Sequence, residues 1–178
     1  MEGKKFAFCP QCGSRRIETK MNGRKWQCPD CGFDLYSNVA SAVGVIIQNE
    51  AGEVLFEKRA KEPRKGFCVV PGGFTNSDET GEAAAVRECA EETGVIAQKI
   101  HYLCSFPNTY EYKEIMYKTC DMFFTAEFPR GVLLTAQQSE VSSLFWQKIE
   151  SIDDLERIPL AFDSTKNALL KWLEEKSK

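Results

Sequence analysis

The 178-residue sequence contains one histidine, His101, and this scarcity excludes several chemistries. A His-rich catalytic zinc site and an H-E-x-x-H motif are absent, and a hydrolytic triad is possible only if His101 serves it. No apolar run approaches the roughly 20 residues that span a bilayer, and the N-terminal residues lack the apolar stretch of a secretory signal. The net charge of −3 provides no general attraction to nucleic acid or anionic lipid. We therefore expect a cytoplasmic protein with no membrane partner.

The charge changes sign near Val39. Residues 1–38 hold seven basic and four acidic residues, a net of +3, whereas residues 39–178 hold 16 basic and 22 acidic residues, a net of −6. No internal repeat, low-complexity tract or Pro/Gly-rich linker separates the two parts. We predict a small module over residues 1–38 and a larger domain over residues 39–178, joined by a short junction at residues 36–40.

Four of the eight cysteines form two C-x-x-C pairs, and each pair is followed by a glycine. The spacing C-x2-C-x15-C-x2-C is typical of a tetrathiolate zinc site, and the Cys-Pro-x-Cys-Gly form resembles a zinc ribbon. Four sulfur ligands close the coordination sphere, so we expect a structural Zn²⁺ that holds together a segment too small to fold alone. Disulfides or a redox C-x-x-C pair are the alternatives. The predicted zinc ligands are Cys9, Cys12, Cys28 and Cys31.

The larger domain is predicted to mix a sheet with two principal helices. Residues 42–47 and 53–59 are expected to form a strand hairpin around a turn at residues 49–52. Further strands are expected at residues 67–70, 100–106, 116–128 and 144–147. A helix is predicted over residues 80–93 with Gly94 as its C-terminal cap, a helical turn over 151–155, and a helix over 164–175 with Asp163 or Ser164 as N-cap.

Three glutamates of the first predicted helix are spaced at positions i, i+3 and i+4. At roughly 100° per residue, Glu88, Glu91 and Glu92 gather on one face, opposite a face that includes Cys89. Carboxylates so close repel one another, so the arrangement needs a compensating cation, either Arg87 or a bound metal. Hard oxygen ligands favour Mg²⁺ or Mn²⁺ over zinc.

Residues 73–95 resemble the Nudix box, G-x5-E-x7-R-E-U-x-E-E-x-G-U. Every specified position matches, and these positions are Gly73, Glu79, Arg87, Glu88, Cys89, Glu91, Glu92, Gly94 and Val95. The chain is identified on this motif as a member of the Nudix hydrolase family, and its cysteine module resembles the zinc ribbon ahead of the Nudix domain in the NADH pyrophosphatase-like group. The resemblance implies an α/β fold, an α/β/α sandwich around a mixed sheet.

The resemblance also implies an activity and its cofactor. Nudix hydrolases cleave a nucleoside diphosphate linked to another group, so we expect a Mg²⁺- or Mn²⁺-dependent pyrophosphohydrolase acting on ADP-ribose, NAD(H) or a dinucleoside polyphosphate. Carboxylates can approach a pyrophosphate only through metal ions, which also activate water and stabilise the leaving phosphate. By motif position, Glu79 would pair with Arg87 to orient the helix, and the metal-ligand candidates are Glu88, Glu91, Glu92 and the carbonyl of Gly72.

Residues after the box are expected to supply substrate contacts, whereas the general base in this family lies either in the box or on a later loop. Glu140 resembles the later acidic position that related enzymes bring to the metals or the water, although a plain exposed glutamate is the alternative. NADH pyrophosphatases carry S-Q-P-W-P-F-P-x-S, whereas this chain has Ser-Phe-Pro-Asn-Thr-Tyr at residues 105–110, which weakens the case for NADH. The residues expected to stack a base are Phe106, Tyr110 and Tyr112.

A second functional class stays open on the sequence alone. In it, the Nudix domain senses a nucleotide while the basic zinc ribbon binds nucleic acid or a protein, with Trp26 and Phe33 as candidates to stack a base. For the basic residues of the ribbon, a solvated surface without a partner is the favoured interpretation. For the larger domain, the complete set of box glutamates favours catalysis over nucleotide sensing. The sequence leaves the oligomeric state open, a homodimer included.

Overall fold

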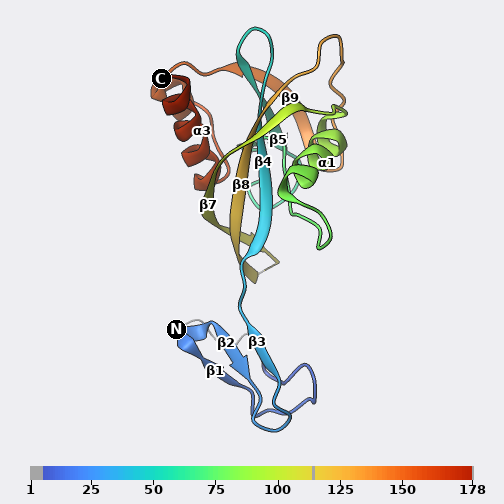
Figure 1. The fold of residues 1–178 in the computed structure, drawn as a ribbon, viewed down its shortest axis with the longest axis vertical. Helices are drawn as coiled ribbons and strands as arrows, with labels where there is room; N and C mark the ends of the chain where they lie inside the picture. The colour runs from blue at the N-terminus through green and yellow to red at the C-terminus, as the bar shows by residue number, and fades with distance from the viewer. Residues whose placement is uncertain (1–5, 114, 178) are drawn as a thin grey trace. The chain divides into compact units, whose positions relative to one another are not determined.

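The computed structural model describes residues 6–113 and 115–177, except for the side chain of Tyr112. The chain divides into two compact units, Met1–Val39 and Ala40–Lys178 (Figure 1). Each unit has its own core. Of the helices in the described residues, none has the length and apolar character that a membrane span requires.

The first unit is a small antiparallel sheet with a core built around cysteines. Trp26 is 5% exposed and packs with Ile17, Cys9 and Cys28, while Phe33 lies against the same cluster. Trp26 therefore forms part of the core of this unit, and its stacking interpretation is wrong, whereas Phe33 is only partly buried. The sheet has the order β1-β2-β3, formed by β1 (Glu18–Lys20), β2 (Lys25–Gln27) and β3 (Asp34–Tyr36), with the short 3-10 turn η1 (Met21–Gly23) between the first two.

The second unit is built on a mixed six-stranded sheet. Its order is β6-β5-β4-β8-β7, and β9 also pairs with β5. The pairing of β4 with β8 is parallel and the other pairings are antiparallel. Every strand predicted from the sequence is present, and β4, β7 and β9 are longer than predicted. The strands are β4 (Ala40–Gln48), β5 (Glu53–Arg59), β6 (Cys68–Val69), β7 (Gln98–Tyr112), β8 (Ile115–Glu127) and β9 (Val141–Lys148).

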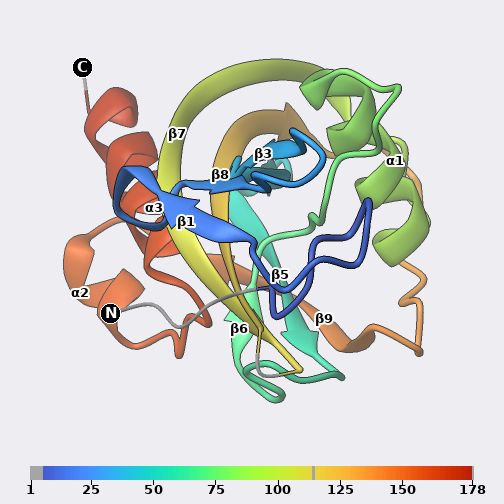
Figure 2. The same cartoon turned by 90° about the horizontal axis from the view of Figure 1, so that it is seen from below.

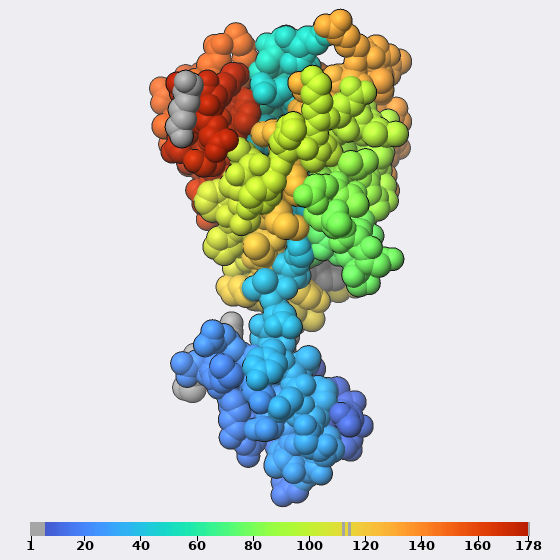
Figure 3. All heavy atoms as spheres, in the orientation of Figure 1, coloured from blue at the N-terminus to red at the C-terminus, as the bar shows by residue number. Residues whose placement is uncertain are grey.

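Helices cover both faces of this sheet. Successive strand residues point to opposite faces, so Val45 of β4 packs in the cluster beneath α1 (Gly81–Thr93), whereas Ile46 packs in the cluster beneath α3 (Asp163–Lys176). Figures 1 and 2 show α1 and α3 on opposite sides of the sheet. In the space-filling view of Figure 3, the yellow-green atoms of β7 lie between the red atoms of α3 and the green atoms of α1, and β7 contacts both helices. The predicted α/β/α sandwich is confirmed.

The predicted C-terminal cap of α1 is confirmed, whereas the predicted N-cap of α3 is not. Thr80 caps α1 with its side chain, which accepts a hydrogen bond from the Ala83 amide, and Gly94 ends the helix in the left-handed conformation. The short α2 (Ile152–Glu156) begins with a capping box at Ser151. In contrast, α3 starts directly after Phe162, so the predicted N-cap role of Asp163 or Ser164 is wrong. The Ser164 hydroxyl donates instead to Asp121 of β8.

Candidate active site

A cavity of about 520 Å³ lies in the second unit, at the end of the sheet where α1 meets the loop before it. Side chains from β5, α1, β7, β8 and the start of α3 line it, together with the backbone of the Pro-Gly-Gly loop. It brings together residues that are far apart in the sequence. Its acidic lining residues are Glu57, Glu62, Glu88, Glu91, Glu92, Asp121 and Glu140.

Gly72, just before the box, and Gly73, its first residue, lie directly against the carboxylates of α1. The Gly72 amide donates to Glu92 Oε2 at 2.8 Å, and Glu92 is 7% exposed. A Cβ atom at Gly72 would lie 2.1 Å from the Val43 carbonyl oxygen, and one at Gly73 would lie 2.6 Å from Glu88 Oε1. A larger residue at Gly72 would collide with the backbone of β4, and one at Gly73 would displace the Glu88 carboxylate. The Pro-Gly-Gly loop therefore packs directly against β4 and the carboxylates.

Glu79 and Arg87 form a two-pronged ion pair, as predicted from the motif. Arg87 Nε donates to Glu79 Oε2 at 3.0 Å, and Nη2 donates to Glu79 Oε1 at 2.5 Å. The same Nη2 donates to the Phe74 carbonyl at 3.0 Å, which ties the loop to the helix. The Arg87 guanidinium and the Asn76 amide lower the pKa of Glu79 to about 2. Glu79 is therefore a permanent anion that fixes the orientation of Arg87.

Arg87 also contacts two of the three predicted ligand glutamates. Its Nη1 donates to Glu88 Oε1 at 2.7 Å and to Glu91 Oε2 at 3.1 Å. Glu91 is largely exposed, whereas Glu92 is buried on the same side of the helix as Cys89. The prediction that Glu92 lies opposite Cys89 is wrong, because residues three apart share a helix face.

The glutamate oxygens are not gathered around one point. Among the residues that the structure describes, only the four cysteines form a set of three or more metal-ligating groups within 4.8 Å of one another. Glu88 and Glu91 accept hydrogen bonds from Arg87, whereas Glu92 accepts one from the Gly72 amide. The assignment of these residues as ligands stays a prediction, and coordination would require their side chains to turn toward a shared ion.

The electrostatics of the cavity fit a hard divalent cation. Burial raises the pKa of Glu92 to about 7, a shift partly opposed by the hydrogen bond from the Gly72 amide. Burial also raises the pKa of Glu88, and Arg87 partly opposes that shift. Carboxylates withdrawn from water are costly when charged, and a divalent cation removes this cost. An all-oxygen donor set of this kind suits Mg²⁺ or Mn²⁺.

Tyr110 lies at the cavity with two aromatic neighbours that the sequence did not reveal. Its ring meets Phe74 edge-on at 5.5 Å between centroids and Phe162 at 5.7 Å. The guanidinium of Arg59 lies 5.4 Å from the Phe162 ring centre, and its Nη2 is 3.4 Å from the Tyr110 hydroxyl. These three rings and Arg59 all line the cavity. They form a surface suited to stacking a planar group.

The other two predicted stacking residues have different outcomes. Phe106 is not among the residues that line the cavity, and it packs against the core on the α3 side of the sheet. The structure therefore gives Phe106 a packing role on the α3 side of the sheet, and its predicted contact with substrate finds no support in the cavity lining. The side chain of Tyr112 lies outside the part of the chain that the structure describes.

Asp121 is a cavity residue that sequence reasoning missed. It is 8% exposed and accepts hydrogen bonds from Thr119 at 2.6 Å, Asn108 at 2.9 Å and Ser164 at 2.7 Å. These donors come from β8, β7 and α3, so only the assembled fold brings them together. An acidic residue in the middle of a predicted strand was the available signal, since such a residue is buried only with partners.

Glu140 lies just before β9 and lines the same cavity. Its Oε1 is 2.8 Å from Lys61 Nζ, and about half of each side chain is exposed. The charge of Glu140 contributes to the raised pKa values of Glu88 and Glu92. The position is compatible with a role beside the metals, and the assignment of Glu140 as base stays a prediction.

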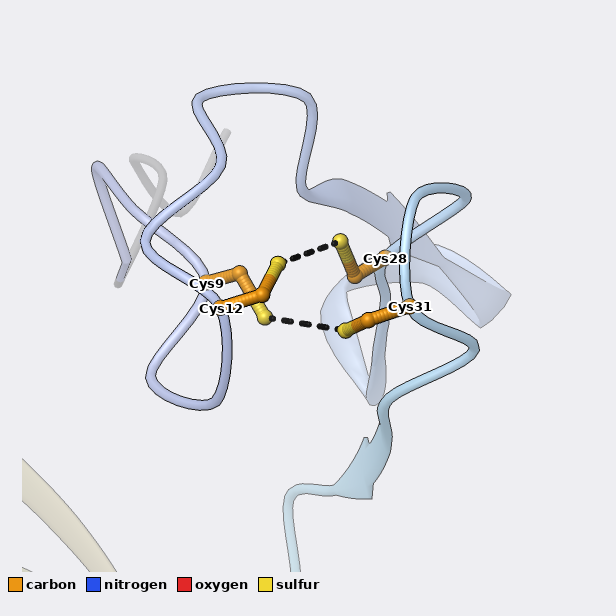
Figure 4. Close-up of side chains that lie close together, drawn as sticks. All are labelled: Cys9, Cys12, Cys28 and Cys31. Atoms are coloured by element: carbon orange, nitrogen blue, oxygen red, sulfur yellow. Dashed lines mark hydrogen bonds between the residues drawn. The ribbon is translucent and has the colours of Figure 1, made fainter.

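The four cysteines of the first unit have the geometry of a tetrahedral metal site (Figure 4). The Sγ atoms of Cys9 and Cys31 are 3.7 Å apart, as are those of Cys12 and Cys28. A tetrahedron with metal–sulfur bonds of about 2.3 Å has edges of about 3.8 Å. All four thiols are free, so the disulfide alternative is wrong. The donor set and its spacing fit Zn²⁺.

Comparison with known proteins gives a family and several relatives. The NUDIX domain model matches residues 39–173. The chain is 30% identical to the NAD-capped RNA hydrolase NudC of Deinococcus radiodurans over 165 residues, which cover 91% of this chain and 55% of the relative. A NUDIX hydrolase from Nitrosomonas europaea has a similar structure, with a TM-score of 0.65, 26% identity, and coverage of 96% of this chain and 92% of the other.

A further structural relative was solved with a ligand. The NUDIX domain of Shewanella oneidensis NrtR, in a complex with ADP ribose, matches with a TM-score of 0.63 and 24% identity, covering 85% of this chain and 94% of that one. At this identity the likeness shows the fold alone. The chain spans about half the length of the curated relatives it matches, at 55% and 51% for two of them.

Proposed function

Because this chain belongs to the NUDIX domain family, we propose that it is a divalent-metal-dependent pyrophosphohydrolase. Its substrate is a nucleoside diphosphate linked to another moiety, of the ADP-ribose, NAD(H) or dinucleoside polyphosphate type. The bond it cleaves is a phosphoric anhydride. The N-terminal unit holds a structural Zn²⁺ through Cys9, Cys12, Cys28 and Cys31.

The main support for this proposal is that buried carboxylates and aromatic rings line the same cavity. Buried carboxylates lie at one part of it, with Glu92 held by the Gly72 amide. Tyr110, Phe74 and Phe162 line the same cavity and offer aromatic rings to a base. A molecule with a pyrophosphate next to a nucleoside could therefore contact both parts at once.

The charges around the cavity support the binding of a diphosphate. Mg²⁺ or Mn²⁺ bound by Glu88, Glu91, Glu92 and the Gly72 carbonyl would polarise the phosphoryl oxygens and activate water. Arg59 and Lys61 line the cavity and place positive charge beside the phosphates. Glu79 holds Arg87, which keeps the glutamate side chains oriented. Glu140 is the candidate to take a proton from the attacking water.

Two features bear on the substrate class. The Gln-Pro-Trp core of the NADH pyrophosphatase motif is absent from residues 105–110. The aromatic surface formed by Phe74, Tyr110 and Phe162 accepts the flat face of any base, while Asp121 and Asn108 are polar groups at the same cavity. The missing Gln-Pro-Trp core weakens the case for NADH within this class, whereas the aromatic surface and the polar groups do not distinguish one member of the class from another.

A panel of nucleotides tests the proposal. The full chain is incubated with ADP-ribose, NAD⁺, NADH and dinucleoside polyphosphates, with and without Mg²⁺, in ¹⁸O-labelled water, and the products are identified by mass spectrometry. We expect Mg²⁺-dependent release of a nucleoside monophosphate from at least one compound. The position of the label shows which phosphorus the water attacks.

Matched variants separate catalysis from folding. Glu92→Gln should abolish turnover, because the amide cannot ligate a cation as a carboxylate does. Glu82→Gln changes an exposed glutamate in the first turn of the same helix and should keep full turnover. If Glu92→Gln retains turnover, or if no compound of the panel is cleaved, the proposed function is wrong.

A further inference from the structure

Glu57 lies where the sheet otherwise buries apolar side chains. It is on β5 and is 2% exposed. Leu55, two residues earlier on the same face, packs in the core cluster beneath α1. The residues paired with Glu57 on the neighbouring strands are Val69 of β6 and Leu144 of β9. An apolar residue would suit this position, so a glutamate here requires a reason.

One oxygen of Glu57 has no hydrogen-bond partner. Among the side chains that the structure describes, Glu57 Oε1 is the buried polar atom left unpaired. The other buried carboxylates at the cavity are satisfied, since Glu92 accepts from the Gly72 amide and Asp121 accepts from three side chains. An unpaired buried oxygen is costly, and native proteins keep few of them.

The surroundings of Glu57 indicate what could pair with this oxygen. The side chain lines the cavity, and its carboxyl group lies within hydrogen-bonding reach of Glu92. Two adjacent buried carboxylates cannot both be charged without cost, so either one of them keeps a proton or a cation binds to both. The nearby guanidinium groups are directed elsewhere: Arg87 contacts Glu79, Glu88 and Glu91, and Arg59 Nε donates to the Pro63 carbonyl.

We propose that Glu57 is an additional carboxylate ligand of the divalent cation centre at Glu88 and Glu92. This ligand comes from β5 and lies outside the glutamate motif of α1. Its unpaired Oε1, buried at the cavity, would be the atom that binds the ion. The inference rests on the proposed function, since it assigns a further ligand to the same metal centre. It gives the centre a rigid anchor on the sheet, whereas α1 supplies the other carboxylates.

Direct Mn²⁺ binding tests this assignment without any turnover. The full chain is freed of Mg²⁺ and Mn²⁺ on a chelating resin, and free Mn²⁺ is followed by electron paramagnetic resonance during a titration. Mn²⁺ prefers oxygen ligands, so the cysteine site does not interfere. We expect Glu57→Gln and Glu92→Gln each to weaken Mn²⁺ binding by at least tenfold, and Glu82→Gln to change it by less than twofold.

Thermal unfolding separates a ligand from a structural residue. If Glu57 is a ligand, Glu57→Gln should match or exceed the wild type in melting temperature without Mn²⁺, yet gain less from added Mn²⁺. A purely structural residue would instead lower the melting temperature under both conditions. Glu57→Met repeats the comparison with an apolar side chain, which suits the apolar neighbours on β6 and β9. Unlike glutamine, methionine has no amide that could donate a hydrogen bond to Glu92.

The outcomes distinguish the two proposals. If the wild type binds no Mn²⁺, the proposed function fails and takes the ligand assignment with it. If the wild type binds Mn²⁺ and both Glu57 variants bind it less than tenfold more weakly, the assignment of Glu57 is overturned while the proposed function stands.

Discussion

The protonation of Glu92 should make the stability of the second unit depend on pH. Burial raises the pKa of this carboxyl from 4.5 to about 7. The folded chain therefore holds the proton more tightly than the unfolded chain does. Between pH 4.5 and pH 7, the free energy of unfolding should fall as the pH rises, because the unfolded state binds fewer protons. The stabilisation is complete below pH 4.5 and is lost above pH 7.

The size of the effect follows from the shift. A change of about 2.5 pH units at about 1.4 kcal/mol per unit corresponds to about 3 kcal/mol. Glu57 and Glu88 also have raised pKa values through burial, so they change stability in the same direction. Glu79 acts in the opposite direction, but its pKa of about 2 confines that effect to pH values below 4.5.

Urea unfolding followed by tryptophan fluorescence measures this dependence. Trp172 is buried against the sheet and reports the second unit. Without Mg²⁺ or Mn²⁺, the wild type should lose stability from pH 5 to pH 8, and Glu92→Gln should lose clearly less. Saturating Mg²⁺ should reduce the loss, because the cation binds the ionised form. Equal pH dependence in the two proteins would refute the burial argument for Glu92.

Two further predictions concern the cysteine site and the aromatic surface. Cys28→Ser should abolish the zinc that a chelator assay finds in the wild type, at about one ion per chain, and should melt the first unit by circular dichroism; full retention of zinc would exclude a four-sulfur site. Tyr110→Ala should raise KM about tenfold with little change in kcat, from the loss of base stacking worth about 1–3 kcal/mol. As a control, Phe106→Ala should leave KM unchanged and lower stability, by less than the roughly 3–5 kcal/mol typical of a fully buried phenylalanine, because Phe106 is only partly buried; a raised KM in that variant would restore Phe106 as a substrate contact.

The local elements could be predicted because short-range signals specify them. Thr80 and Gly94 set the two ends of α1 through capping chemistry, and the apolar run at residues 42–47 identified the first long strand. The cysteine spacing identified four thiols that the structure brings together. The glutamate motif identified residues that line one cavity, because a helix fixes their spacing.

The set of side chains that line the cavity could not be predicted from the sequence, because these side chains come from segments that are far apart in the chain. Glu57, Asp121 and Phe162 come from β5, β8 and the residue before α3, and no local pattern connects them. Even within α1, whether each glutamate is buried or exposed depends on where the Pro-Gly-Gly loop and Arg87 lie. The sequence alone determined the family, the elements and the carboxylates of the helix, since these follow from local spacing. Only the tertiary structure decided which side chains share the cavity and which oxygen is left unpaired, because burial and desolvation arise when separate strands and helices pack together.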